Sequence, residues 1–175
     1  MREPVWKYAR TRPGNFPTRR IAMLAKSVLG GFSLMGRILE PGCNNATAEA
    51  LFNWEHDEGY WADHSDFGMK GARIPVTLSE SARRLLAINL AAPMLYAYGA
   101  WRGDADLTQR GMDIWSDSEP ENNSIIRQWK AAGIGCGSAA ESQGLLQLRK
   151  EYCDRNRCLN CRFGHALLRK AYETV

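Results

Sequence analysis

Apolar residues recur at helical spacing along most of this chain, and strand-like alternation of useful length is missing. The spacing predicts helices over about 18–29, 33–39, 45–54, 80–98, 104–115, 118–132, 138–152 and 163–172. The first helix should end at Gly30-Gly31, with Arg19, Arg20 and Lys26 off its apolar stripe. That stripe consists of Ile21, Leu24, Ala25, Val28 and Leu29.

The segment at about 80–98 is apolar nearly all round after Arg84, which places it at the centre of a helical domain. Pro93 should kink it near Asn89, because proline removes a backbone hydrogen bond. We therefore predict an all-α fold: a single compact domain of about seven helices around this central helix. It would span residues 18–175, after a basic and aromatic N-terminal arm at 1–17. Capping-box patterns predict three helix starts, at Thr77-Leu-Ser-Glu80, Ser118-Glu-Pro-Glu121 and Ser138-Ala-Ala-Glu141.

Size and charge narrow the class of protein. A chain of 175 residues can bury one sizeable core. We expect it to be cytoplasmic, because no export signal is visible and the longest apolar run, of 17 residues, is too short for a membrane span. The net charge is +6 over 1–40, −7 over 41–122 and +5 over 123–175. The basic ends either meet as one face for a polyanion or pair with the acidic middle.

A loop after the third helix is dense in carboxylates and contains His56 and His64. Such groups can bind a metal or perform acid–base chemistry. Their spacing, however, matches no metal-binding template, such as two histidines at i and i+4. The loop is therefore either the site of a small metal-dependent enzyme or a solvated acidic loop anchored by its aromatic residues, Trp54, Tyr60 and Trp61.

Three of the five cysteines fall within nine residues near the C-terminus. Cys153, Cys158 and Cys161 have the spacing C-x4-C-x2-C, and His165 follows four residues later. We call residues 153–165 the cysteine hook. Because positions i and i+4 share a helix face, Cys161 and His165 can point at one ion. The four side chains then form a closed tetrahedral zinc site that joins two helices.

Three other interpretations of the hook stay open. The same spacing occurs in iron–sulfur ligation, which requires a fourth cysteine such as Cys136 or Cys43. Cys158-Leu-Asn-Cys161 can instead be a redox pair whose thiolates are favoured by neighbouring arginines. Alternatively, the thiols carry no ligand and pack in a helical corner. Cys43 and Cys136 stand alone, and we expect each to be a small buried apolar side chain.

Cationic residues cluster around the hook and near the N-terminus. Such residues are candidates for contacting phosphates, with binding that weakens as salt is added. Sequence-specific recognition is not supported, because no known reading helix or base-stacking motif is present. A solvated cationic face is the alternative. The candidates are Arg149, Lys150, Arg155, Arg157 and Arg162 around the hook, and Arg12, Arg19 and Arg20 near the N-terminus.

Five stretches of the chain are distinctive together. They are Thr11-Arg-Pro-Gly-Asn-Phe-Pro-Thr-Arg-Arg20, Ile88-Asn-Leu-Ala-Ala-Pro-Met-Leu-Tyr-Ala-Tyr-Gly99, Glu121-Asn-Asn, Ser142-Gln143, and Tyr152-Cys153 through Cys158-Leu-Asn-Cys161-Arg-Phe-Gly164. In this order they resemble the C-terminal half of an uncharacterised bacterial family, domain-of-unknown-function family 2851, which is frequent in Bacteroidetes.

The resemblance implies no activity, because none is established for the family. It implies that longer members carry a preceding half with a Gly-Asp-(Ile/Val)-Glu-Ile-His type motif, reminiscent of metal-dependent nuclease cores. It also implies that Cys153, Cys158 and Cys161 belong to the family pattern, whereas His165 and Cys136 are particular to this chain.

Three functional hypotheses follow. The first is a non-catalytic helical accessory domain, zinc-stapled if the hook binds metal, that binds nucleic acid non-specifically as part of a larger, nuclease-like protein. The second is a protein-interaction or structural domain without nucleic-acid binding, whose partner is the missing N-terminal half or another protein. An exposed apolar patch would support it. The third is a small metal-dependent enzyme using His56, His64 and nearby carboxylates.

Overall fold

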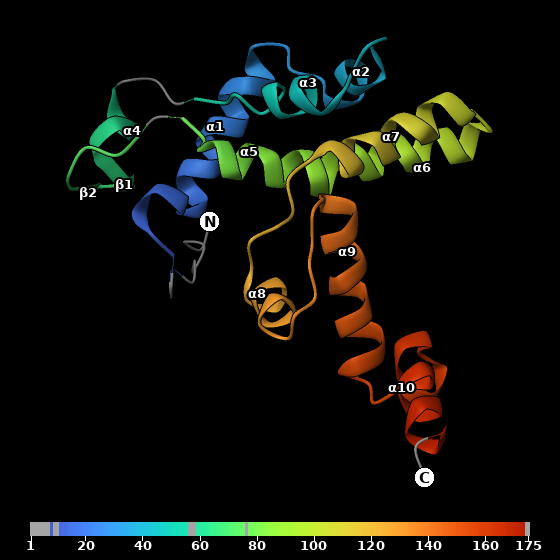
Figure 1. Cartoon of the computed structure of the whole chain (residues 1–175). Coiled ribbons are helices and arrows are strands. Elements are labelled where there is room, and N and C mark those ends of the chain that lie inside the picture. The colour runs from blue at the N-terminus through green and yellow to red at the C-terminus, as the bar shows by residue number, and fades with distance from the viewer. Residues whose placement is uncertain (1–7, 9–10, 56–58, 76, 174–175) are drawn as a thin grey trace. The chain divides into compact units, whose positions relative to one another are not determined.

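The computed structural model describes residues 8, 11–55, 59–75 and 77–173. The predicted all-α class is confirmed, because the described chain is mostly helical and its sheet is one short hairpin. No helix in these ranges is both long and apolar enough to cross a membrane. The chain divides into two compact units, Met1–Gly111 (unit 1) and Met112–Val175 (unit 2), and each is described by itself (Figure 1).

Unit 1 begins with short helical elements whose starts follow from local capping. After the 3-10 turn η1 (Pro13–Asn15) come α1 (Pro17–Leu29), α2 (Leu34–Leu39) and α3 (Asn45–Ala50). The side chain of Ser33 accepts a hydrogen bond from the Gly36 amide, and Asn44 forms a capping box with Thr47. The first three predicted helices are therefore present, although the third ends earlier than its apolar pattern suggested.

An ordinary amphipathic helix buries its apolar stripe, whereas α1 exposes its apolar stripe and buries another face. Its buried residues are Thr18, Arg19 and Met23. The apolar stripe faces outward: Ile21 is 51% exposed, Leu24 43%, Val28 56% and Leu29 89%. The Arg19 side chain is fully buried and donates from Nη2 to the Pro75 carbonyl at 2.9 Å.

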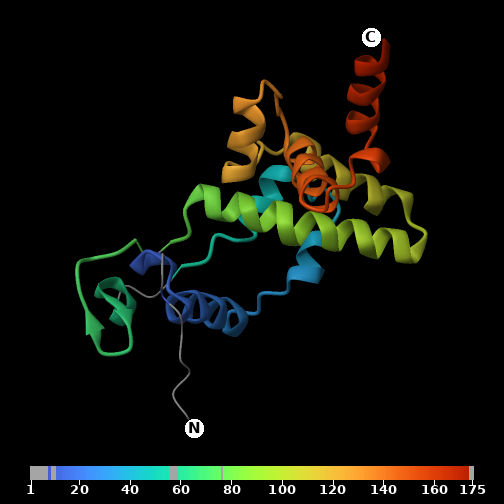
Figure 2. The same cartoon turned by 90° about the horizontal axis from the view of Figure 1, so that it is seen from below.

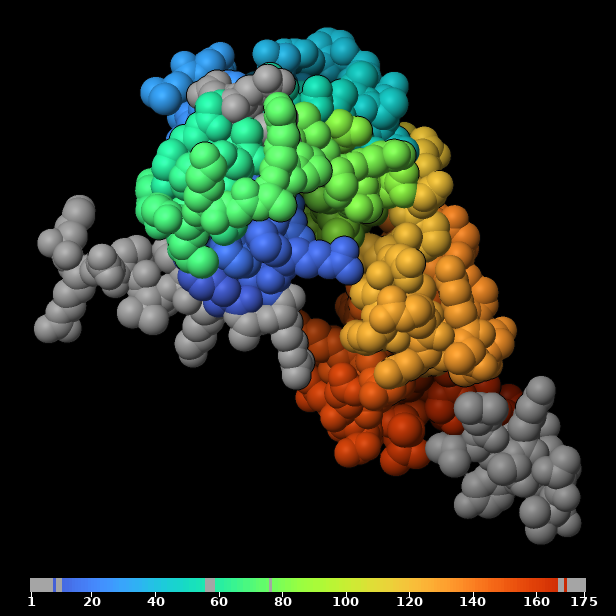
Figure 3. All heavy atoms as spheres, turned by 90° about the vertical axis from the view of Figure 1, so that its left-hand side faces the viewer, coloured from blue at the N-terminus to red at the C-terminus, as the bar shows by residue number. Residues whose placement is uncertain are grey.

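A small hairpin lies against α1 (Figure 3). It follows α4 (Tyr60–Asp63) and consists of β1 (His64–Asp66) paired antiparallel with β2 (Met69–Lys70). Thr18 of α1 donates from its hydroxyl to the Ser65 carbonyl at 3.3 Å. Strands of three and two residues are too short to show an alternating pattern, so the sequence does not predict them.

The central helix runs without a break from α5 (Glu80–Leu86) through the π-helical turn η2 (Ala87–Ala91) to α6 (Ala92–Arg102). The irregularity predicted near Asn89 takes the form of this π turn, in which the Ala92 amide donates to the Ala87 carbonyl. The predicted helix start at Glu80 is confirmed, whereas the predicted capping residue, Thr77, is wrong. Ser79 caps the helix by accepting from the Ala82 amide, whereas Thr77 forms a bridge with Glu55.

Helices α6 and α7 (Ala105–Asp117) run side by side after a left-handed turn at Gly103 (Figures 1 and 2). Two glycines permit their close approach. A Cβ on Gly99 would lie 2.6 Å from the Thr108 amide nitrogen, and one on Gly111 would lie 2.8 Å from the Tyr96 nitrogen. Small residues at these positions therefore set the spacing between the two helices.

Unit 2 contains α8 (Ser124–Ala131), α9 (Ala139–Leu148), the π turn η3 (Arg149–Cys153), the 3-10 turn η4 (Cys158–Asn160) and α10 (Arg162–Glu173). The capping box expected at Ser118 is wrong, because the buried Ser118 hydroxyl donates to the Ile114 carbonyl and Asn123 caps α8 instead. The start at Ser138 is confirmed, since its side chain accepts from the Glu141 amide.

Candidate functional site

The hook has an ordered backbone built from local hydrogen bonds. The Arg157 amide donates to the Tyr152 carbonyl at 2.9 Å, which closes the turn after η3. Asn156 takes the left-handed conformation in this turn, with φ 52°, which asparagine adopts more readily than most residues. The Cys161 amide donates to the Cys158 carbonyl at 3.1 Å, and the His165 amide donates to the Cys161 carbonyl at 2.8 Å. The hook therefore connects η3 to α10 through short hydrogen-bonded turns.

Gly164 holds the start of α10 directly against Cys158. A Cβ at this position would lie 2.3 Å from the Cys158 carbonyl oxygen and 3.0 Å from its carbonyl carbon and Cα. Real Cβ atoms essentially never approach other atoms that closely, so any residue other than glycine would require the Cys158 backbone to move. The contact is with backbone, and a side-chain rotation cannot relieve it.

The structure brings the three hook cysteines to one groove of about 260 Å³ in unit 2. Cys153 and Cys158 are exposed, Cys161 is buried, and all three are free thiols. Apart from the thiols, the groove is lined by Trp129, Ile134, Leu145, Leu148, Tyr152, Phe163 and Gly164. The described residues contain no group of three or more His, Cys, Asp and Glu side chains close enough to hold a metal ion.

The other candidate ligands lie outside this groove. His165 is exposed and is not among its lining residues. Cys136 is half-buried, and its thiol donates a hydrogen bond to the Ser138 carbonyl oxygen at 3.6 Å. Burial, followed by the charge of Glu141, raises the pKa of the Cys136 thiol, which disfavours the thiolate that a metal requires. Cys43 is buried, as expected.

The cations around the hook fall into two groups. Arg149 pairs with Asp154 at 2.6 Å, and Arg155 pairs with Glu151 at 2.9 Å, so their charges are partly compensated. The remaining candidates are exposed and have no ion-pair partner in the described part of unit 2. They are Lys150, Arg157 and Arg162.

The N-terminal candidates differ from one another in accessibility. Arg12 is exposed. Arg19 is buried, and its Nε and Nη1 have no hydrogen-bond partner among the described residues. Burial, and then the charge of Arg20, lowers the pKa of Arg19. Arg20 is half-buried and donates to the Asn15 side chain. Of these three, only Arg12 is freely accessible to a large polyanion.

The acidic loop is only partly described, and His56 lies outside the described residues. The ring of His64 stacks on Tyr60 with centroids 3.9 Å apart, and its Nδ1 lies 2.7 Å from Asp63 Oδ1. Lys70 Nζ lies 3.1 Å from the other Asp63 oxygen. The hydrogen bond from Lys70 holds the pKa of Asp63 below its ordinary value. The hydrogen bond from His64 also lowers this pKa, whereas partial burial raises it.

Asp66, on the same hairpin, accepts hydrogen bonds from the Tyr8 hydroxyl and the Phe67 amide. The Tyr8 hydrogen bond lowers the pKa of Asp66, and the same contact raises the pKa of Tyr8. These carboxylates are thus engaged in structural contacts. A catalytic role for His56 and His64 stays a prediction.

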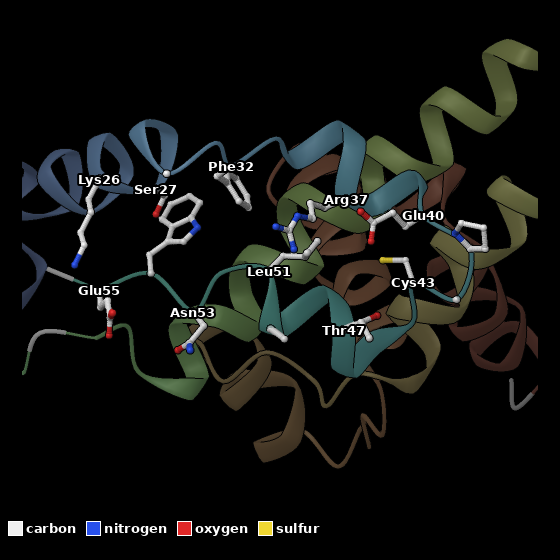
Figure 4. A pocket seen from close by; sticks show the side chains of 15 residues that line it. Lys26, Ser27, Phe32, Arg37, Glu40, Cys43, Thr47, Leu51, Asn53 and Glu55 are labelled. Carbon is white, nitrogen blue, oxygen red and sulfur yellow. The ribbon is translucent and has the colours of Figure 1, made fainter.

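A second concave site lies in unit 1 among α1, α2 and α3, with a cavity of about 570 Å³ (Figure 4). Arg37, Glu40 and Cys43 point into the same space beside apolar Leu51. Trp54 also lines it, and its buried Nε1 has no hydrogen-bond partner among the described residues. A cavity that combines an apolar wall with a few polar groups is typical of small-molecule sites. The sequence does not predict it, because its residues come from three helices and from the segments between and after them, and they follow no spacing.

A model of the family described as "Protein of unknown function (DUF2851)" matches residues 1–124. The match includes the first three of the five stretches that suggested this resemblance, which is confirmed. Ser142-Gln143 and the whole cysteine hook lie beyond the matched residues. Searches of curated proteins and of solved structures found no match to this chain.

Proposed function

The chain belongs to the DUF2851 family, and we propose that it binds nucleic acid non-specifically through the exposed cations of its cysteine hook. One observation carries this proposal. Lys150, Arg157 and Arg162 are exposed, closely spaced in the chain and without an ion-pair partner in the described part of unit 2. Because they pair with no carboxylate among the described residues of unit 2, they can neutralise phosphates without breaking a described ion pair.

The ordered backbone of the hook supports the same proposal. Arg157 and Arg162 flank η4, whose position against α10 is fixed by the Gly164 contact. Side chains on a fixed backbone lose less conformational freedom on binding than side chains on a flexible tail. Arg149 and Arg155 contribute less, because each must first leave its carboxylate partner.

Three phosphate contacts predict weak, salt-sensitive binding. Each contact adds about 0.9 to the slope of log K against log salt, so a slope of about −2 to −3 is expected. Dissociation constants of about 10⁻⁴ to 10⁻⁶ M are typical of non-specific binding at physiological salt. The binding should not depend on base sequence, because phosphates carry no sequence information.

Fluorescence anisotropy with labelled duplex DNA and RNA tests the proposal over a salt series. The double variant Arg157→Ala/Arg162→Ala should bind more weakly at low salt, with a slope shallower by about 2. The matched control is Arg127→Ala/Lys130→Ala on α8, which removes the same charge from exposed positions elsewhere in unit 2. Equal losses in both variants would show a general charge effect, and the proposal would be wrong. Absence of binding at low salt would refute it as well.

We also propose that the hook binds one zinc ion through Cys153, Cys158, Cys161 and His165. The spacing of these residues and the shared groove of the three thiols support this, and His165, which lies outside that groove, would have to turn toward it. Elemental analysis and an absorption spectrum of anaerobically purified protein test it. We expect one zinc per chain, lost in Cys158→Ser and retained in the control Cys136→Ser. Iron with sulfide would indicate a cluster, and absence of metal would leave three free thiols.

A further inference from the structure

Unit 1 exposes an apolar groove beside the outward stripe of α1. Its cavity is about 590 Å³. Ile21 and Leu24 of α1 form one side, and Leu85 and Leu86 of α5 form the other. Leu78 also lines the groove, and Arg20 and Asn89 supply polar groups. A contiguous apolar surface with few polar groups is typical of an interaction site.

We propose that this groove binds an amphipathic, acidic helix of another protein. The partner helix would place apolar side chains at i, i+3 or i+4, and i+7 between α1 and the α5–η2 segment. This inference goes beyond the proposed nucleic-acid binding, because it uses unit 1 alone and involves no residue of the hook.

The walls of the groove favour a helix as the occupant. Its two sides are the helical segments α1 and α5, and helices pack into such grooves by fitting their ridges between those of their neighbours. None of the described residues that line the groove belongs to a strand, so an extended peptide has no strand edge with which to pair.

Charge favours an acidic partner. Residues 17–29 of α1 contain no Asp or Glu, and Arg19 is buried, so Arg20 is the α1 cation that faces the groove. Arg20 lines the groove, and its guanidinium contacts the Asn15 side chain and the Met23 sulfur but no carboxylate among the described residues. A partner carboxylate could therefore form a charge-assisted hydrogen bond with Arg20.

The same observations argue against two other occupants. A second copy that offered its own α1 would bring a helix without Asp or Glu and with the same Arg20, and like charges oppose that contact. A lipid bilayer presents a flat surface, whereas Leu78, Leu85 and Leu86 line a hollow that a protruding ridge of side chains fits better.

Selection from a displayed peptide library on the immobilised full chain tests the proposal. Random peptides of about 16 residues are long enough for four helical turns. Enriched sequences should combine apolar residues at helical spacing with a net negative charge. A synthetic peptide of the enriched sequence should become helical on binding, as measured by circular dichroism.

Two variants locate the binding site of that peptide. Leu24→Glu should weaken its binding at least about tenfold, because a buried leucine contact is replaced by a charge that repels the acidic peptide. Leu159→Glu is the control, because it places the same charge at an exposed leucine of unit 2, and it should leave binding unchanged. Arg20→Glu should also weaken binding, and replacing a glutamate of the peptide by lysine should restore it.

Several results would overturn the proposal. They include no enriched peptide, enriched peptides without acidic residues, and equal effects of Leu24→Glu and Leu159→Glu. A dimer in light scattering that Leu24→Glu dissociates would identify a second copy as the occupant. Sedimentation with phosphatidylcholine and phosphatidylserine vesicles that Leu24→Glu abolishes would identify a membrane surface instead.

Discussion

Replacing Gly164 by alanine tests the backbone contact that positions the hook. The new Cβ would lie 2.3 Å from the Cys158 oxygen, whereas carbon–oxygen contacts in proteins ordinarily begin near about 3.3 Å. The Cys158 peptide must therefore retreat by about 1 Å. Overpacking of this kind typically costs about 1–3 kcal/mol. Alanine has a better helix propensity than glycine, which offsets at most about 1 kcal/mol of this cost. The variant should therefore be less stable than the original protein.

Differential scanning calorimetry of the full chain measures the effect. For a unit as small as Met112–Val175, each kcal/mol should lower the transition temperature by about 4–8 °C. Reaction of the thiols with a disulfide reagent gives a second measurement, because displacement of Cys158 should also expose the buried Cys161. Faster modification of Cys161 is expected in the variant.

Gly144→Ala on α9 is the matched control. This glycine is exposed, and its Cβ would meet no atom within 4 Å, so alanine should stabilise the same unit by about 0.5–1 kcal/mol. The two substitutions should therefore shift the transition in opposite directions. If Gly164→Ala leaves the transition unchanged or raises it, the close packing of α10 against Cys158 is refuted.

Three further predictions concern the rest of the fold. Leu95→Ala should destabilise unit 1 by about 2–5 kcal/mol in chemical denaturation, because Leu95 is fully buried, and Leu86→Ala should cost less because Leu86 lines an open groove. Lys70→Met should raise the pKa of Asp63 toward its ordinary value in a carboxyl NMR titration. Since the folded-state pKa of Asp63 is depressed, its contribution to stability is present above its unfolded-state pKa and should be lost as pH falls through the folded-state pKa. Ser138→Ala should destabilise α9 by about 1 kcal/mol in thermal unfolding monitored by circular dichroism, because the Glu141 amide loses its acceptor.

The helical elements were predictable because their signals are local. Ser138 lies directly before an apolar helical run, and its side chain caps that helix as the pattern indicates. Ser118 shows the same four-residue pattern, but its hydroxyl bonds the preceding turn, and Asn123 is the cap. A short pattern identifies a residue that can cap a helix. It does not decide which of two nearby candidates does so.

The packing of α1 was not predictable for a different reason. Helical spacing shows that Ile21, Leu24 and Val28 share a face, but it does not show what that face contacts. In the folded unit the other face is buried, with Arg19 in its interior. Tertiary contacts of the hairpin and of Pro75, distant in sequence, determine this choice.

For the candidate site, Cys153, Cys158 and Cys161 are close in sequence and all three line one groove, while their role as metal ligands stays a prediction. The exposure of neighbouring arginines and their ion pairs was not predictable, because these depend on side-chain directions after folding. The Gly164 contact was also not predictable. It depends on the return of α10 toward Cys158, and no sequence pattern specifies that approach.

The π turn η2 has a consequence for how the family can vary in length. A π turn contains one residue more than an α turn, so side chains on either side of it are offset by about 100° relative to a regular helix. Before the turn, Arg84 reaches Glu49 of α3, and after it Gly99 meets Thr108 of α7. A relative that lacks one residue within 87–91 could not keep both contacts in the same orientation. A one-residue alignment gap at this position would therefore mark relatives whose first unit is assembled differently.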